Sequence, residues 1–461
     1  MAAESTRYFA AQAWVDGAWA QDVLLTAGRD GHWLSIEPNA APEALRGAER
    51  LSGPVLPGLV NAHSHAFQRA IAGLTERSNG SDDDFWSWRD RMYSAALRIT
   101  PDQLEAVAAL LYAELLQAGY TQVCEFHYLH NNTDGRPYAD PLAMSLALVR
   151  AAQRVGMGLT LLPTLYMRSG FGAAGLREDQ RRFASTPESV LRLAEGALAL
   201  GYDRINAGLA LHSLRAVDAA ALLEVAAAAR AQGMAVHIHI AEQMQEVDAC
   251  VAATGQRPLD WLLSHAPVDA RWNLVHATQA SGAELQGVQR SGATVVICPT
   301  TEANLGDGVF DLPAYAKAGG RWSIGSDSHV TRSWQEELRV LEYSQRLSLR
   351  QRNIASRVLG GPSSAAMLFS AALAGGSAAT SLSMVGLAVG QRADFAVVDL
   401  SSAALLGVPA DHVLDAMVFS SPDTRLSEVF VAGRRVVSGG QVTDWPRLAA
   451  DFSQAMKVLW A

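Results

Sequence analysis

Lysine is almost absent from this sequence, and charged residues of every kind are scarce. Only Lys317 and Lys457 occur among the 37 lysine and arginine residues, and Asp, Glu, Lys and Arg together make up 18% of the chain. The formal net charge is −9, and the sequence contains no block of basic residues. Because nucleic acids and anionic membranes select clustered positive charge, the sequence predicts neither as a partner.

Cysteine is equally scarce, and long apolar runs are missing. Cys124, Cys250 and Cys298 are far apart and odd in number, which argues against a disulfide framework or a zinc knuckle. The first residues do not combine a basic segment with an apolar one, so no secretory signal is expected. The uncharged stretch between Arg357 and Arg392 is interrupted by glycines and serines, which favours a buried helix over a membrane span. A cytoplasmic protein is expected.

Apolar residues make up 49% of the 461 positions, enough for a large core. Short apolar runs that end in polar residues alternate with alanine- and leucine-rich segments of helical periodicity. Segments 101–118 and 187–200 begin with proline directly after a threonine, a helix-start signal. The alternation predicts a (β/α)8 TIM-like barrel. Its eight expected strands lie at 55–65, 121–128, 159–166, 207–213, 235–242, 273–278, 294–299 and 322–327.

The two ends of the chain have a different pattern, with short β runs and tight turns. Asp16-Gly17 between two Trp-bearing runs predicts a hairpin, and segments 393–400 and 428–438 are further candidate strands. We therefore expect a small β-sandwich-like domain assembled from both termini. The predicted limits are 1–54 for its N-terminal part, 55–370 for the barrel and 371–461 for the segment that completes it.

Ligand-type side chains end four of the predicted barrel strands, and the carboxyl ends of barrel strands carry active sites. A histidine alone is more often a core residue, but four such strand ends together predict a metal centre. Imidazoles with one carboxylate suit Zn²⁺ or Fe²⁺. The residues are His63 and His65 on one face of the first strand, His237, His239 and Glu242 on the fifth, His276 on the sixth and Asp327 on the eighth.

These motifs resemble those of the amidohydrolase superfamily: His-X-His after the first strand, His-X-X-Glu on the fifth, His on the sixth and Asp on the eighth. The resemblance covers the barrel and the split β flank. It implies that His237 is a decoy, a histidine that looks like a ligand but is not one. The residue three positions before Glu242, as the His-X-X-Glu motif requires, is His239. It also implies a metal bound by His63, His65, His239 and Asp327, with Glu242, His276 and Asp327 as the catalytic residues.

The lysine count bears on the number of metal ions. Many superfamily members bridge two metals with a carbamylated lysine, but neither Lys317 nor Lys457 ends a middle barrel strand. One divalent ion is therefore expected, zinc in the first place with iron as the alternative, as in the branch that releases ammonia from C=N carbons. Such an ion lowers the pKa of its water, whose proton Asp327 is expected to accept. Glu242 would protonate the imine nitrogen, and His276 would stabilise charge at the tetrahedral carbon.

The segment 61–69, NAHSHAFQR, narrows the range of possible substrates. Together with segments 86–93, 125–130 and 211–215 it resembles the superfamily members that convert N-formimidoyl-L-glutamate to N-formyl-L-glutamate and ammonia in histidine degradation. A substrate with two carboxylates needs forked cationic donors, for which arginine suits better than lysine. The resemblance implies a small dicarboxylate substrate, a homodimer, and substrate binding by Gln68, Arg89, Tyr128, His212 and Arg215.

Two other interpretations stay open. The nearest is another mononuclear aminohydrolase acting on guanine, an adenosine derivative or a chlorotriazine, whose pocket would need groups that recognise a heterocycle. The second is a non-catalytic barrel that serves as a binding scaffold, although none of the expected ligand types is missing. Arg89 and Arg215 could also be members of ordinary surface ion pairs.

Overall fold

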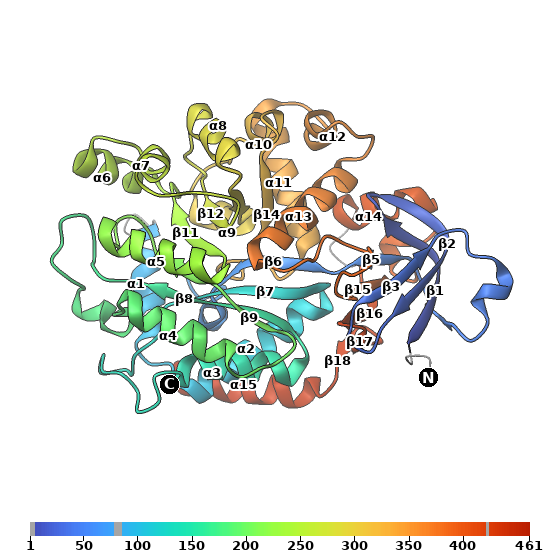
Figure 1. The fold of residues 1–461 in the computed structure, drawn as a ribbon, viewed down its shortest axis with the longest axis horizontal. Helices are drawn as coiled ribbons and strands as arrows, with labels where there is room; N and C mark the ends of the chain where they lie inside the picture. Colours follow the sequence, from blue (N-terminus) through green and yellow to red (C-terminus); the bar gives the residue numbers. More distant parts are fainter. Residues whose placement is uncertain (1–4, 78–84, 421–423) are drawn as a thin grey trace.

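A computed structural model of the chain describes residues 5–77, 85–420 and 424–461. Two nine-stranded sheets organise it: a parallel one in the middle of the chain and a second one at its two ends (Figure 1). The segment in which we expect no secretory signal begins with residues 1–4, which lie outside the described residues. The predicted α/β barrel with a small β unit from both termini is confirmed.

The parallel sheet is a nearly closed barrel with eight strand positions, each of which overlaps a predicted strand. One position is interrupted at Gly208 and is occupied by two short strands. The first and last positions meet through a bridge between Ser64 and Asp327, which brings the predicted ligands of both together. The strands are β6 (Leu59–Ser64), β7 (Tyr120–His127), β8 (Gly158–Leu165), β9 (Ile205–Ala207), β10 (Leu209–Leu211), β11 (Val236–Ile240), β12 (Trp272–His276), β13 (Thr294–Ile297) and β14 (Arg321–Ile324).

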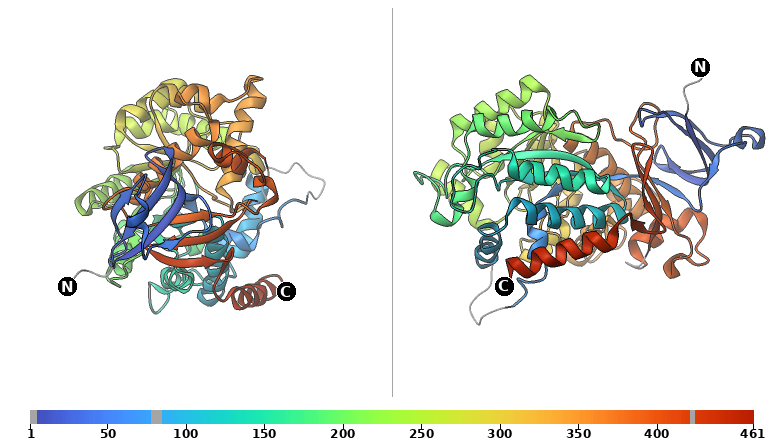
Figure 2. Two further views of the ribbon diagram at one scale, coloured as in Figure 1. Left: turned by 90° about the vertical axis from the view of Figure 1, so that its right-hand side faces the viewer. Right: turned by 90° about the horizontal axis from the view of Figure 1, so that it is seen from below.

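Helices surround the barrel on the outside, as Figures 1 and 2 show. Thr100 and Thr186 cap α2 and α4 with proline at the first helical position, which confirms the two predicted helix starts. The helices that follow the strands are α2 (Pro101–Gln117), α3 (Ala143–Val155), α4 (Pro187–Leu198), α5 (Ala219–Gln232), α6 (Met244–Thr254), α7 (Pro258–His265), α8 (Gly282–Ser291), α9 (Pro299–Leu305), α10 (Leu312–Lys317), α11 (Trp334–Leu349), α12 (Ile354–Leu359) and α13 (Ser364–Thr380).

The second sheet joins both chain ends in the order β18-β17-β16-β15-β5-β1-β2-β3, with β4 beside β1. Asp16 and Gly17 have positive φ and form the predicted hairpin turn, and the rings of Phe395 and Phe430 stack in the sheet's core. The strands are β1 (Thr6–Val15), β2 (Ala18–Ala27), β3 (Trp33–Glu37), β4 (Glu49–Arg50), β5 (Val55–Pro57), β15 (Phe395–Val398), β16 (Leu426–Val431), β17 (Arg434–Ser438) and β18 (Gln441–Val442).

Two local features differ from the sequence pattern. The predicted strand 55–65 is divided at Gly58: β5 pairs with β1 and β15 in the terminal sheet, and only β6 enters the barrel. A side chain at Gly58 would overlap Thr121, so the crossing between the sheets needs glycine. Helix α13 spans residue 370 and packs on β14 and β6. The predicted domain limits therefore stay a proposal: β5 lies in the terminal sheet although it falls within 55–370, and α13 crosses the predicted limit at residue 370.

The C-terminal segment also contributes helices. Helix α14 (Val413–Phe419) packs on α11 and α13, and α15 (Trp445–Leu459) lies along α2, below the barrel in Figure 1. The uncharged stretch before Arg392 forms the largely buried α13, as predicted. Within the described ranges, no helix combines the length and apolar character that a membrane crossing requires.

Candidate active site

Three imidazoles and one carboxylate converge at the carboxyl end of the barrel. His63 lies in β6 with His65 just beyond it, His239 lies in β11, and Asp327 follows β14. The Nε2 atoms of the three histidines lie 3.0–3.3 Å from one another. Asp327 Oδ1 is 3.4 Å from His63 Nε2 and 3.3 Å from His65 Nε2. Four donor atoms, carried by three strands that are far apart in the sequence, therefore surround one point.

Hydrogen bonds behind two of the rings fix which nitrogen faces this point. His65 Nδ1 lies 2.8 Å from the carbonyl oxygen of Phe126, and His239 Nδ1 lies 3.0 Å from that of His212. A carbonyl only accepts, so each Nδ1 carries the proton and each Nε2 presents a lone pair. Burial lowers the pKa of His63 to about 3 and also lowers those of His65 and His239, which keeps all three rings neutral.

The donor set fits a divalent cation. Ligand atoms about 2.0–2.1 Å from a tetrahedral zinc ion lie about 3.3–3.4 Å from one another, close to the separations observed here. Neutral imidazoles with one carboxylate are also the ligand types that such ions select. Both lysines are exposed, Lys317 on α10 and Lys457 on α15, so neither reaches this cluster.

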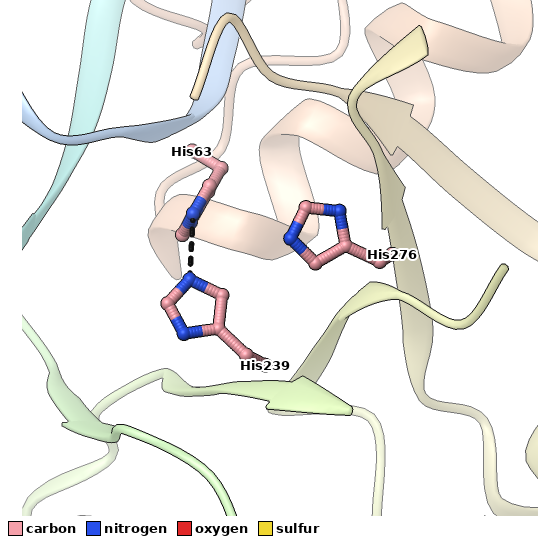
Figure 3. A group of neighbouring side chains, drawn as sticks. All are labelled: His63, His239 and His276. Carbon is pink, nitrogen blue, oxygen red and sulfur yellow. Dashed lines mark hydrogen bonds between the residues drawn. The ribbon is translucent and has the colours of Figure 1, made fainter. Parts of the chain in front are cut away.

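His276 lies beside the cluster, as Figure 3 shows for His63, His239 and His276. Its Nε2 is 3.6 Å from Glu242 Oε1 and 3.9 Å from Asp327 Oδ2, and its Nδ1 is 3.3 Å from Glu302 Oε1. Burial alone would lower the pKa of His276, but the charge of Glu242 and the hydrogen bond with Glu302 outweigh it and raise the pKa to about 10. His276 is thus held as a cation between carboxylates.

Glu242 is the carboxylate that faces His276 Nε2 at 3.6 Å. Burial, together with the nearby charge of Asp327, raises the pKa of Glu242 to about 7, although His276 opposes that shift. A carboxyl group with such a pKa can both accept and release a proton near neutral pH.

Strained backbone accompanies these side chains. Ala241, His276 and Asp327 all have positive φ, which is uncommon for residues other than glycine and concentrates at functional sites. Glu246 holds part of this backbone, because it accepts hydrogen bonds of 3.0 Å from the N–H groups of Ala241 and Glu242. Glu302, which contacts the His276 ring, accepts a hydrogen bond from the N–H group of Cys298.

Glu246 and Glu302 were missed by the sequence analysis. Neither belongs to a ligand motif, and no residue pattern identifies the backbone N–H groups that both bind or the His276 ring that Glu302 contacts. The available signals were weak: Glu246 follows Glu242 by four positions, and Glu302 lies just past the seventh strand. Glu125, equally overlooked, accepts hydrogen bonds from Ser64 Oγ and Ala66 N–H and so supports the loop that carries His65.

The five residues predicted to bind substrate all line one pocket above the cluster. The structure brings together Gln68, Arg89, Tyr128, His212 and Arg215 with His65, His239, Glu242, His276 and Asp327 in its wall. Gln68 donates to the hydroxyl of Tyr128 over 3.1 Å, and in the described part of the chain its buried Oε1 has no partner. Within segment 86–93, the side chains of residues 86, 87 and 90 lie outside what the structure describes. The roles of these residues stay predictions.

Two other residues that share the motifs do not line the pocket. The decoy His237 lies two residues before His239 on β11, within hydrogen-bonding distance of the carbonyl oxygen of Ala379, 2.8 Å away. Arg69 forms a double hydrogen bond with Glu114 instead of lining the pocket. Because a strand has a period of two, His237 and His239 share one face of β11, and their positions along the strand separate them: His239 lies nearer the carboxyl end, where the pocket is.

The lowered histidine pKa values predict that metal binding tolerates mild acid. Protons compete with a metal only below the folded pKa, which burial puts at about 3 for His63, so loss of metal should begin well below the ordinary histidine value of about 6.5. Equilibrium dialysis of the purified protein against metal-free buffer at about pH 7 and about pH 5.5, followed by metal analysis, should give equal contents. Half-loss of metal between these two values would contradict the buried, neutral ligand set.

Comparison with known proteins agrees with this geometry. The model of the amidohydrolase family matches residues 55–436, and the chain belongs to that family. It is 47% identical over 449 residues to the formimidoylglutamate deiminase of Pseudomonas aeruginosa, covering 97% of this chain and 98% of that protein. A 5-methylthioadenosine/S-adenosylhomocysteine deaminase of Halobacterium salinarum is 28% identical, over 78% of this chain and 76% of its own. A crystal structure of an amidohydrolase from Brucella melitensis superposes with a TM-score of 0.92 at 43% identity, over 99% of this chain and all of that one.

Proposed function

We propose that this chain is a metal-dependent hydrolase that converts N-formimidoyl-L-glutamate to N-formyl-L-glutamate and ammonia in histidine degradation. The observation that carries the proposal is the pairing of two groups in one pocket. Arg89 and Arg215 line the same pocket as His65, His239 and Asp327 of the cluster. A molecule with a planar C=N carbon at one end and two carboxylates at the other matches both. The 47% identity to the Pseudomonas aeruginosa protein supports this substrate.

His63, His65, His239 and Asp327 would hold one divalent metal ion, zinc in the first place and iron as the alternative. Their donor atoms have the mutual separations that one ion requires. Such an ion, when bound, lowers the pKa of a water molecule and polarises a C=N bond.

The surrounding side chains would move the protons. Asp327, whose pKa stays low beside His63 despite burial, is ionised and would accept the proton of the attacking water at its carboxylate. Glu242, poised near neutrality, would protonate the imine nitrogen to an amine, and the proton that Asp327 takes from the water would then reach the same nitrogen, so that it leaves as ammonia. His276, held as a cation, would stabilise negative charge as the carbon becomes tetrahedral.

The substrate's amidine would lie toward Gln68, and its glutamate part toward the arginines. Gln68 Oε1 is a buried acceptor that can receive the N–H between the formimidoyl carbon and the glutamate. Tyr128 and His212 would complete the wall, with Tyr128 held by Gln68. A neutral heterocycle such as guanine, adenosine or a triazine offers no counterpart to two guanidinium groups, which disfavours the alternative aminohydrolases.

Replacing either pocket arginine is expected to weaken substrate binding while leaving the metal in place. Arg89→Met and Arg215→Met should each raise KM for N-formimidoyl-L-glutamate by about 10- to 100-fold, because a charge-assisted contact to a carboxylate is lost. Steady-state kinetics with parallel metal analysis would measure this. Arg69→Met is the matched control, since that guanidinium bonds to Glu114 outside the pocket. Unchanged KM in both pocket variants would place the dicarboxylate elsewhere.

Product analysis tests the proposed reaction. Deimination cleaves the bond to the terminal nitrogen and yields ammonia with N-formyl-L-glutamate, whereas cleavage of the other C–N bond yields formamide with glutamate. NMR of the reaction mixture separates the two outcomes. We expect only the first pair of products, and formation of formamide would overturn the proposed chemistry.

A cytoplasmic location and a homodimer are also proposed. Light scattering on the purified protein would test the dimer directly. A mass of about 49 kDa, that of one chain, would contradict it.

A further inference from the structure

A buried glutamine joins two tyrosine hydroxyls at the wall of the pocket. Gln180 lies in η3 (Glu178–Phe183) and is fully buried. Its Nε2 donates to the hydroxyl oxygen of Tyr93 over 3.1 Å and to that of Tyr166 over 3.0 Å. Tyr93 comes from α1 (Phe85–Ala96), and Tyr166 follows β8. Both tyrosines line the pocket beside Arg89 and Arg215.

The orientation of the amide decides the direction of these hydrogen bonds. Gln180 Oε1 accepts from the backbone N–H of Arg177 over 3.1 Å, so the oxygen faces that backbone and the NH₂ group faces the tyrosines. An amide nitrogen only donates, and both phenol oxygens therefore act as acceptors toward Gln180. Each hydroxyl retains its own proton for a further partner.

Tyr166 is constrained a second time. Its side chain also hydrogen bonds with Arg215, whose guanidinium can only donate. With two donors directed at the phenol oxygen of Tyr166, the remaining capacity of that group is to donate. In the described ranges, neither the Tyr93 nor the Tyr166 hydroxyl donates to another residue of the chain. A buried hydroxyl whose proton is unused favours an acceptor supplied from outside.

We infer that Tyr93 and Tyr166, oriented by Gln180, donate hydrogen bonds to the carboxylate that Arg89 and Arg215 attract, and so determine specificity for an anionic group. This inference rests on the proposed function and adds to it two specificity residues and one positioning residue. Burial raises the pKa of Tyr93, which keeps the hydroxyl protonated as a donor. A carboxylate oxygen accepts from guanidinium and phenol donors together, whereas an ammonium or methyl group does not.

Reversing the polarity of residue 180 tests the arrangement. Gln180→Glu has the same shape, but its carboxylate accepts hydrogen bonds, so both hydroxyl protons turn toward it and phenol lone pairs face the substrate. We expect KM for N-formimidoyl-L-glutamate and the Kd for glutarate to rise about 10- to 100-fold, with kcat changed by no more than about threefold. Calorimetry gives the Kd without requiring turnover.

Removal of the hydroxyls provides the second measurement. Tyr93→Phe and Tyr166→Phe should each raise both constants about tenfold, and Gln180→Glu should add nothing when both tyrosines are already phenylalanine. Tyr315→Phe is the control, because Tyr315 is a buried tyrosine on α10 whose hydroxyl donates to the carbonyl of Arg321. That variant should lose stability without a change in KM. Because phenylalanine keeps the ring, these variants remain informative even if Gln180→Glu does not fold.

The outcomes separate this inference from the proposed function. Deiminase activity with unchanged KM and unchanged glutarate Kd in the phenylalanine variants overturns the role of the hydroxyls and leaves the function intact. No activity on N-formimidoyl-L-glutamate, combined with weaker glutarate binding in the same variants, overturns the function and supports carboxylate recognition by the hydroxyls.

Discussion

Glu242→Gln is expected to lower kcat by about 10²- to 10⁴-fold, the contribution of a general acid–base group, without loss of metal. The physical reason is local. Burial raises the pKa of Glu242 to about 7, and its Oε1 lies 3.6 Å from His276 Nε2, so this carboxyl group can deliver a proton at the pocket wall. Glutamine keeps the shape and the neighbouring contacts but cannot deliver that proton. Ammonia release per bound metal ion measures the effect.

The matched comparison uses a second glutamate on the same segment. Glu246→Gln retains Glu242 but weakens the hydrogen bonds that the carboxylate accepts from Ala241 and Glu242 N–H groups. We expect a smaller loss of kcat, with lower thermal stability. A Glu242→Gln enzyme with wild-type kcat would remove Glu242 from the chemistry.

Loss of one imidazole is expected to abolish metal binding and activity together. His239→Ala removes a donor atom that lies within 3.3 Å of both His63 Nε2 and His65 Nε2. Metal content and kcat/KM should both fall by at least about 100-fold, because even residues behind a ligand cost about 10- to 100-fold in affinity. Elemental analysis with the ammonia assay would show the joint loss. Added Zn²⁺ should restore chelator-treated wild type but not the variant.

His237 supplies a demanding control for this experiment. It is two positions away on the same strand, fully buried, and within hydrogen-bonding distance of the carbonyl oxygen of Ala379. His237→Asn should keep its metal even if it is less stable. Metal loss in this variant, or metal retention in His239→Ala, would contradict the choice of His239 as the ligand from β11.

The barrel could be predicted from the sequence because its signals are local. Runs such as 235–242 alternate with helices that begin at Thr-Pro, and each signal is complete within about ten residues. The ligand strands followed from the same pattern, since all parallel strands present their carboxyl ends at one rim. The resemblance then supplied the distinction between His237 and His239.

What escaped prediction depends on contacts between distant segments. The break at Gly58 follows from the need to pass Thr121, which is 63 positions along the chain and invisible to a scan for apolar runs. Gln180 meets Tyr93 across 87 positions, in a short 3₁₀ segment without periodicity. Glu246 and Glu302 bind backbone N–H groups, and backbone strain leaves no mark on side-chain patterns.

The most direct test of the central claim is the ratio of kcat/KM values for a panel of substrates with metal-quantified protein. The panel is N-formimidoyl-L-glutamate, N-formimidoylglycine, guanine and adenosine, with ammonia release as the common readout. We predict that N-formimidoyl-L-glutamate exceeds N-formimidoylglycine by at least about 100-fold, since the glycine compound lacks the side-chain carboxylate, and that the purines give no ammonia. Equal turnover of the two formimidoyl compounds, or preference for a purine, would contradict the dicarboxylate pocket built around Arg89 and Arg215.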